Sequence, residues 1–313
     1  MSERLRMIKA RRPSAGTIAF LGRGFICGVA FTALLLGLSP AGTAETSLVP
    51  RPSTDDCGVA APCHVPGGEY RVRMPQGWDG TSRVGAILYL HGYRGTAENA
   101  INNKGLIRTA SDLSLALITL QGAERSWSFP GNPRQRRDNI AFIRTVLDDA
   151  VAHHAVDPDK VMASGFFVGG SMVWYLACYL GDRFADFAPV AGAFWEPQPT
   201  GCPGPESDLF HVHGTGDKVV PMAGRAIGDV AHQADVNEGM ALWLAKGACT
   251  TEVPQEFKPD DTGLVCQRRT ACAGRTIELC LHPGDHVFKP VWVKRAWLEL
   301  ADLRGWDVPT DAQ

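Results

Sequence analysis

Three separate turns of this 313-residue sequence carry residue types that can act together in catalysis. The first, "GFFVG" from Gly165 to Gly169, has two glycines with three residues between them, as in a strand–turn–helix elbow that presents a nucleophile. Asp217 follows a short apolar run, and His286 lies in the glycine-containing segment "LHPGDHVF". A nucleophile, an aspartate and a histidine in this chain order can carry out acyl transfer, because the histidine activates the nucleophile and the aspartate orients the histidine.

The centre of the elbow, however, is Phe167, where a nucleophile is required. A benzyl side chain has no lone pair and no titratable proton, so it cannot form a covalent acyl intermediate. A bulky residue at the centre of such a turn also adopts a costly backbone conformation. Loss of a triad nucleophile lowers turnover by about a millionfold. We therefore expect the sequence to be inactive or strongly impaired by this route.

Three other groups are alternatives to the missing nucleophile. Ser171 is expected to lie a full turn into the helix that follows the elbow, and Ser164 is expected to point into the sheet. A water activated by His286 is the third alternative, but the ring of Phe167 is expected to obstruct it.

Two further sets of residues are candidates for binding a substrate. The turn "LHGYRG" follows an early apolar run, and the backbone N–H of Tyr93 with that of Val168 could stabilise an oxyanion. Trp127, Phe129 and Trp195 fall at predicted loop positions and are candidates for the wall of a substrate pocket. The same aromatic side chains could equally serve core or lid packing.

Short, nearly continuous apolar runs that end in glycine or a small turn must position these groups. Runs of this kind are typical of parallel strands that are buried on both faces. They occupy residues 85–92, 115–122, 160–165, 187–192 and 208–214, and helical patterns lie between or after them at 136–156, 168–180 and 236–248. The alternation predicts a single-domain α/β fold with a doubly wound, mostly parallel sheet. The candidate site then lies at the carboxyl ends of the strands.

Taken together, these motifs resemble the secreted esterases of the polyhydroxybutyrate depolymerase family, which also contains feruloyl and acetylxylan esterases. The matching segments span roughly residues 68 to 300 and include "LYLHGYRG", "HVHGTGDKVVP" and "LHPGDHVF". The resemblance implies an α/β-hydrolase fold and ester hydrolysis by serine, aspartate and histidine, without a metal or an organic cofactor. Asp217 and His286 match the family's acid and base, Tyr93 and Val168 match its oxyanion positions, and Phe167 stands at the serine position.

Two interpretations follow. In the first, the chain is an esterase whose nucleophile has been replaced, since the acid, the base and both oxyanion turns are retained. In the second, it is a non-catalytic ligand-binding protein on an α/β-hydrolase scaffold, in which Phe167 adds apolar surface to the cleft. We favour the first. A small or soluble ester is the expected substrate, with a polyester or an acylated polysaccharide as further candidates.

The N-terminal segment predicts export to the periplasm or the outside of the cell. Basic residues precede a 14-residue apolar run, Phe25 to Leu38, and "SPAGTA" then offers a signal-peptidase site. The run is short for a membrane span, which needs about 20 residues, although an uncleaved anchor is the alternative. We expect a signal peptide at 1–44, an extension at 45–67, the hydrolase domain at 68–305 and a tail at 306–313. No stable membrane insertion is expected after cleavage.

Charge and cysteine content agree with export. Six of the 31 basic and one of the 33 acidic residues lie in 1–44, so the mature chain has 25 basic and 32 acidic residues, which argues against nucleic-acid binding. Eight cysteines remain after residue 44, and an even number in an exported chain predicts disulfides. The pairs Cys57–Cys63, Cys178–Cys202 and Cys272–Cys280 are plausible among 105 possible pairings. A zinc site is the weaker alternative, because the cysteines are dispersed.

Overall fold

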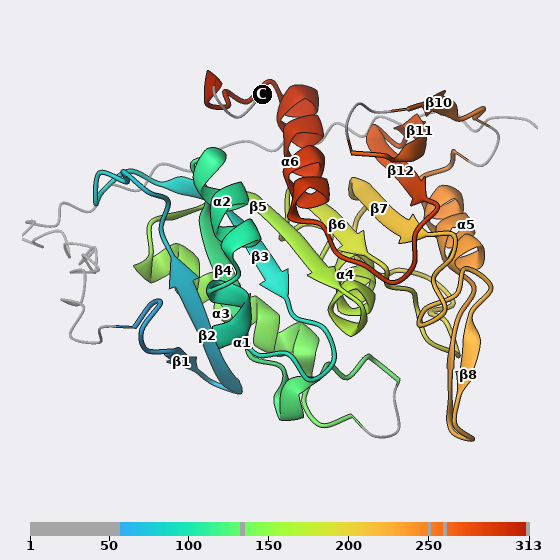
Figure 1. Cartoon of the computed structure of the whole chain (residues 1–313), viewed down its shortest axis with the longest axis horizontal. Helices are drawn as coiled ribbons and strands as arrows, with labels where there is room; N and C mark the ends of the chain where they lie inside the picture. The colour runs from blue at the N-terminus through green and yellow to red at the C-terminus, as the bar shows by residue number, and fades with distance from the viewer. Residues whose placement is uncertain (1–56, 132–134, 250–251, 259–261, 311–313) are drawn as a thin grey trace, which may run out of the picture. The chain divides into compact units, whose positions relative to one another are not determined.

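The computed structural model describes residues 57–131, 135–249, 252–258 and 262–310, so the predicted signal peptide and residues 45–56 lie outside it. A ten-stranded sheet forms the centre, in the order β1-β2-β4-β3-β5-β6-β7-β12-β11-β10 (Figure 1). Its middle strands, from β4 to β12, run parallel. The strands are β1 (Cys63–Val65), β2 (Gly68–Arg73), β3 (Val84–Leu90), β4 (Ala116–Leu120), β5 (Val156–Phe166), β6 (Asp186–Val190), β7 (Leu209–Gly214), β10 (Gln255–Phe257), β11 (Val265–Cys272) and β12 (Arg275–His282).

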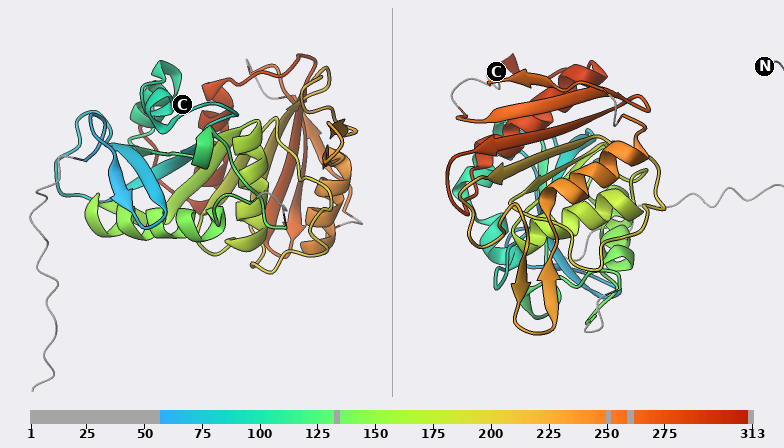
Figure 2. Two further views of the ribbon diagram at one scale, coloured as in Figure 1. Left: turned by 90° about the horizontal axis from the view of Figure 1, so that it is seen from below. Right: turned by 90° about the vertical axis from the view of Figure 1, so that its right-hand side faces the viewer.

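Helices cover both faces of this sheet (Figure 2). Helices α3 (Asn139–His153), α4 (Val168–Tyr179) and α5 (Val236–Lys246) pack on one face, while α2 (Lys104–Asp112) and α6 (Pro290–Arg304) pack on the other. A short helix, α1 (Ala97–Ile101), and a single turn, η1 (Ala123–Arg125), follow β3 and β4. Among the described helices, none is both long and apolar enough to cross a bilayer. The predicted doubly wound α/β fold is confirmed.

Apolar runs explain why the five predicted strands form the middle of the sheet. Every residue of β4, β6 and β7 is buried, because helices cover both of their faces. On α3, the apolar side chains of Ile143, Val146 and Leu147 are buried against the sheet. The core therefore lies on both sides of the parallel strands and holds their carboxyl ends in one row.

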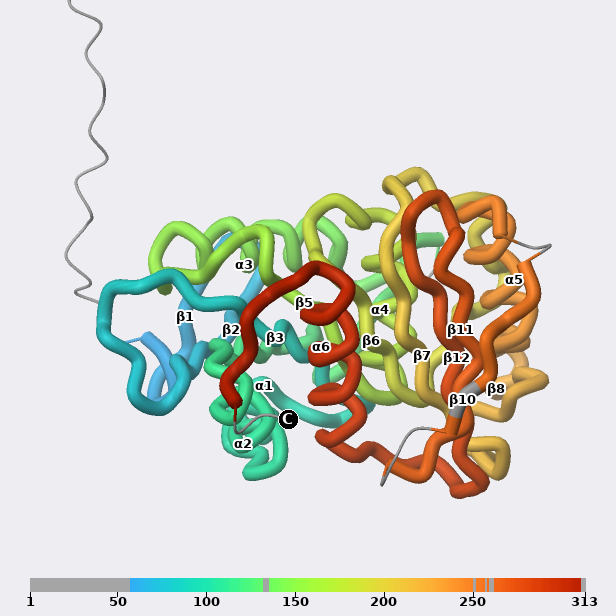
Figure 3. The backbone as a smooth tube through the Cα atoms, turned by 90° about the horizontal axis from the view of Figure 1, so that it is seen from above, coloured from blue at the N-terminus to red at the C-terminus, as the bar shows by residue number. Residues whose placement is uncertain are grey.

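Antiparallel strands extend the sheet at both edges, and the sequence analysis did not predict them. At one edge β1, which falls within the expected N-terminal extension, pairs with β2, and β2 pairs with β4. At the other edge β11 and β10 lie beside β12 (Figure 3). A separate hairpin of β8 (Arg225–Ile227) and β9 (Ala231–Gln233) precedes α5. In β2 and β11, half-buried or exposed residues separate the buried ones, so these strands lack the continuous apolar runs of the middle strands.

Four disulfides join all eight cysteines from Cys57 onward. Cys57–Cys63 and Cys178–Cys202 are as predicted. The predicted pair Cys272–Cys280 is wrong: the remaining disulfides are Cys249–Cys272 and Cys266–Cys280. The reason is the register of the β11–β12 hairpin, which places Cys272 opposite Arg275 and Cys280 opposite Cys266. Because all eight thiols are paired, the zinc alternative has no free cysteine ligand.

Candidate active site

A sharp turn joins β5 to α4 at the centre of the sheet. Phe167 has φ 58° and ψ −122°, a conformation that residues with a side chain rarely adopt, and Val168 begins the helix. The flanking glycines are required by close approach. A Cβ on Gly165 would lie 2.7 Å from the backbone of Gly169, and one on Gly169 would overlap the carbonyl oxygen of Leu90. The backbone is therefore that of a nucleophile elbow with a phenylalanine at its centre.

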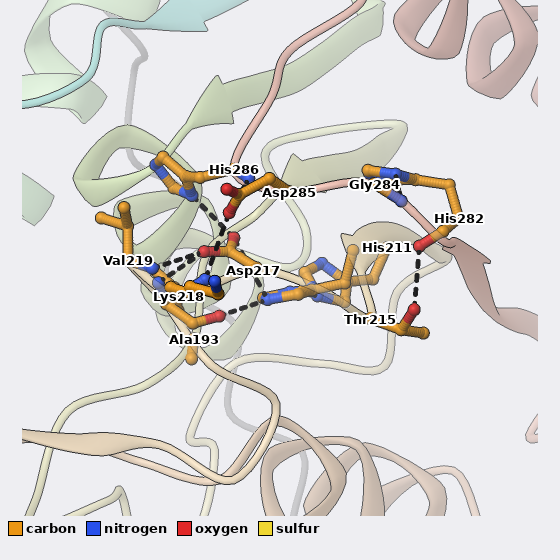
Figure 4. Close-up of polar contacts among 12 residues, drawn as sticks. Ala193, His211, Thr215, Asp217, Lys218, Val219, His282, Gly284, Asp285 and His286 are labelled. Atoms are coloured by element: carbon orange, nitrogen blue, oxygen red, sulfur yellow. Dashed lines mark hydrogen bonds and ion pairs between the residues drawn. The ribbon is translucent and has the colours of Figure 1, made fainter.

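Asp217 and His286 meet beside this elbow (Figure 4). Asp217 follows β7, His286 follows β12, and these two strands are parallel neighbours, so their carboxyl ends bring the loops together. The His286 Nδ1–H donates to Oδ2 of Asp217 at 2.6 Å. The N–H groups of Val219 and Val220 donate to Oδ1, both at 2.8 Å. Burial raises the pKa of Asp217, but these hydrogen bonds outweigh it and leave the pKa below its ordinary value.

The other side of the His286 ring faces the two phenylalanines of the elbow. The ring centroids of His286 and Phe167 are 4.8 Å apart in an edge-on arrangement, and Phe166 lies 4.6 Å away. Among the residues that the structure describes, none forms a hydrogen bond with Nε2 of His286, although this atom is buried. A buried ring nitrogen without a partner is uncommon, because its desolvation is not compensated. His286 thus has one nitrogen fixed by a carboxylate and the other against Phe167.

Both alternative serines form hydrogen bonds elsewhere. The hydroxyl of Ser164 donates to the carbonyl of Ala188 at 2.8 Å, within the sheet. The Ser171 hydroxyl accepts from the N–H of Ala193 at 3.2 Å. Each side chain is almost completely buried. Neither serine therefore contacts His286.

The turn after β3 lies against the elbow. A Cβ on Gly92 would be 3.7 Å from that of Phe167, and Tyr93 follows with about half of its surface exposed. His91 holds this turn: its Nε2 accepts from the N–H of Gly122 at 3.0 Å, and its carbonyl accepts from the Trp127 indole at 2.8 Å. Burial lowers the pKa of His91, which favours the neutral ring that this acceptor role requires.

Comparisons with known proteins agree with this geometry, although no protein-family model matches the chain. NocK of Nocardia uniformis subsp. tsuyamanensis, named as an esterase, is 28% identical over 221 residues, which cover 64% of this chain and 64% of NocK. "Probable feruloyl esterase C" of Aspergillus clavatus is 25% identical over 202 residues, or 61% of this chain and 69% of that protein. An acetyl xylan esterase structure from Aspergillus awamori has a TM-score of 0.54 at 12% identity and covers 74% of this chain and 94% of its own. The chain has the α/β-hydrolase fold, and its sequence is similar to esterases.

The aromatic residues suggested as a pocket wall lie in two places in the structure. Trp127 is buried beneath the turn that carries Tyr93, where its indole is bonded to His91. Phe129 is also buried, stacked on Tyr175 at 4.8 Å, with the half-buried Trp195 at 5.6 Å. Contact of these three rings with a substrate stays a prediction.

Beside Asp217, the structure has a buried pair of histidines that the sequence analysis did not recognise as a pair. His211 and His213 both belong to β7 and are fully buried. The sequence analysis did not single out His211, although residues two apart on a strand share one face. The pattern "HVH" before Asp217 therefore contained the signal.

Proposed function

We propose that the chain is an exported carboxylic-ester hydrolase of the serine–aspartate–histidine type, in which position 167 is the nucleophile position. The observation that carries this proposal is Nε2 of His286. It is buried, has no hydrogen-bond partner among the described residues, and faces the side chain at the elbow centre, while Nδ1 is held by Asp217. A serine hydroxyl at position 167 would supply the partner that this nitrogen lacks.

The chemistry of such a site follows from the groups present. With serine at 167, the hydroxyl oxygen attacks the ester carbonyl while Nε2 of His286 takes its proton. Asp217 stabilises the imidazolium that forms, and the N–H groups of Tyr93 and Val168 are the proposed donors to the oxyanion. The proton then passes to the departing alcohol, and water releases the acyl group by the same steps.

Phe167 stops this sequence at its first step. The ring has no atom that can attack a carbonyl, and its edge-on contact with His286 occupies the space above the base. We therefore propose that the protein as written is inactive or strongly impaired. The retained dyad favours this interpretation over a non-catalytic binding protein, which has no need of an Asp217–His286 hydrogen bond.

The substrate class is proposed from the relatives' names and the export signals. The names of the feruloyl esterase and the acetyl xylan esterase specify feruloyl esters and acetyl xylan as substrates. We propose acylated polysaccharides or small soluble esters for this chain, with polyesters of the polyhydroxybutyrate type as a further candidate. The four disulfides and the predicted signal peptide support export.

The decisive experiment compares the unmodified protein with Phe167→Ser and Phe167→Ala on p-nitrophenyl acetate and methyl ferulate. We expect turnover only with Phe167→Ser, and labelling of residue 167 by a serine-directed phosphonate. Phe167→Ala is the matched control, because it removes the ring without adding a nucleophile. Activity of the unmodified protein, or of Phe167→Ala, would contradict the assigned role of position 167. If the folded Phe167→Ser protein is inactive, the ligand-binding interpretation is favoured instead.

A further inference from the structure

A chain of three short polar contacts passes through the buried histidine pair behind Asp217. Nδ1 of His211 lies 3.1 Å from the carbonyl oxygen of Pro189, on the neighbouring strand β6. Nε2 of His211 lies 3.0 Å from Nδ1 of His213. Nε2 of His213 lies 2.7 Å from the carbonyl oxygen of Val220. Both ends of this chain are therefore carbonyl oxygens, which can only accept hydrogen bonds.

Two neutral imidazoles cannot satisfy these three contacts. Each neutral ring carries one N–H, so the pair has two protons for three contacts. Whichever tautomers are chosen, at least one contact is left between two acceptors. If both outer contacts are made, the nitrogens of His211 and His213 face each other 3.0 Å apart without a proton between them. One added proton, giving an imidazole–imidazolium pair, satisfies all three contacts at once.

The pair acts on the triad acid through Val220. The carbonyl of Val220 receives the His213 contact, while the N–H of the same residue donates to Oδ1 of Asp217. Nε2 of His213 also lies 3.7 Å from Oδ2 of Asp217, the oxygen that holds His286. The His213 contact and one hydrogen bond to the Asp217 carboxylate therefore meet at a single residue, through its carbonyl and its N–H.

Charges around the pair oppose and favour protonation. Burial lowers the pKa of both His211 and His213, and His213 lowers the pKa of His211 further. His286 and His282 also lower the pKa of His213, whereas the carboxylate of Asp217 raises it. On its other side His211 meets the ring of Trp174, 5.0 Å away, which carries no charge. The added proton is thus expected on the acidic side of the ordinary histidine range.

We propose that His211 and His213 form a positioning pair for the triad acid, which takes up one shared proton and holds the Val219–Val220 turn best in that protonated state. The consequence for turnover rests on the proposed function, whereas the shared proton itself does not. His213 contacts the carbonyl oxygen of Val220, and His211 determines which nitrogen of His213 carries a proton.

The first experiment needs no activity, so it uses the unmodified protein labelled with 15N-histidine. Ring nitrogens are followed by NMR from about pH 3.5 to pH 8, a range that extends well below ordinary histidine titration. We expect His211 and His213 to shift together in a single step, and the Nδ1 proton of His286 to shift with them. In His211→Gln the joint step should disappear, whereas the exposed-site control His64→Gln should leave it unchanged. Separate titration curves, or no shift of the His286 proton, would overturn the proposal.

The second experiment uses Phe167→Ser as background. His213→Gln keeps a donor for the Val220 carbonyl, so kcat should stay within about threefold, whereas His213→Leu should lower kcat about 10- to 100-fold with little change in KM. Equal activity of the two variants would refute the positioning role. If Phe167→Ser is itself inactive, the proposed function fails, but the NMR experiment still decides the inference about the pair.

Discussion

The conformation of Phe167 leads to a prediction in which the usual order of alanine and glycine is reversed. In most positions Gly→Ala stabilises a protein by about 0.4–1 kcal/mol, because glycine has more freedom in the unfolded chain. At φ 58° and ψ −122°, a side chain of any size strains the backbone, whereas glycine adopts this region readily. We therefore expect Phe167→Gly to be more stable than Phe167→Ala.

The magnitude can be estimated from three contributions. The half-buried ring of Phe167 contributes about 1 kcal/mol, since full burial of such a side chain is worth about 1.5–3 kcal/mol. Both variants lose this contribution. Only Phe167→Gly relieves the strain, about 1–3 kcal/mol, against about 0.4–1 kcal/mol from the greater freedom of the unfolded chain. The free energy of unfolding of the glycine variant should therefore exceed that of the alanine variant by about 1 kcal/mol and lie close to that of the unmodified protein.

Guanidinium denaturation with the disulfides intact measures this difference, and a thermal melt should show it as about 2–4 °C. Ala241, an exposed residue in the middle of α5, provides the matched control. Ala241→Gly should destabilise by about 1 kcal/mol, the normal order. If Phe167→Ala is as stable as Phe167→Gly or more stable, while the control behaves normally, the elbow is not strained by its side chain. Our interpretation of its backbone is then wrong.

Three further predictions concern the elbow, the acid and the edge of the sheet. Gly169→Ala should destabilise the protein by more than about 3 kcal/mol or prevent folding, because its Cβ would overlap a β3 carbonyl oxygen. Gly201 has open space around it, so Gly201→Ala should change stability by less than about 0.5 kcal/mol in the same denaturation assay. Asp217→Asn should destabilise the protein at pH 7. Because the folded pKa of this carboxyl is lowered, its contribution to stability is complete above about pH 4 and is lost as the pH falls through the folded pKa. The free energies of unfolding of the two proteins should therefore converge in acid, and a constant difference would contradict the assignment. Replacing Cys266 and Cys280 together by alanine should cost about 3 kcal/mol, the value for a loop of this length, and an unchanged denaturation midpoint would count against the Cys266–Cys280 disulfide.

The middle of the sheet and the elbow were predictable because their sequence signals are local. Continuous apolar runs located β3 to β7, and the glycine spacing around Phe167 located the turn. Asp217 and His286 followed from chain order, since both come after strands that end on the same side of the sheet.

The parts that were missed depend on contacts between distant segments. The pairing of Cys266 with Cys280 is set by the register of the β11–β12 hairpin, and sequence spacing alone does not give that register. The edge strands β1 and β10 have only three residues each, and β11 is largely polar, so their sequences resemble loops. His211 and His213 are recognisable as partners only when Pro189 on β6 and Val220 beyond the strand are seen to lie at either end of them.

The elbow also has a consequence for redesign. Its shape is maintained by backbone contacts of Gly165 and Gly169, none of which involves the side chain at position 167. The scaffold therefore leaves the choice of reacting atom open. A cysteine there would take the acyl group of an ester as a thioester and release the alcohol, whereas an aspartate would displace the halide of an alkyl halide and form an alkyl ester. In each case the same histidine is available to activate the water that hydrolyses the intermediate. One side chain would then set the reaction class of an otherwise unchanged fold.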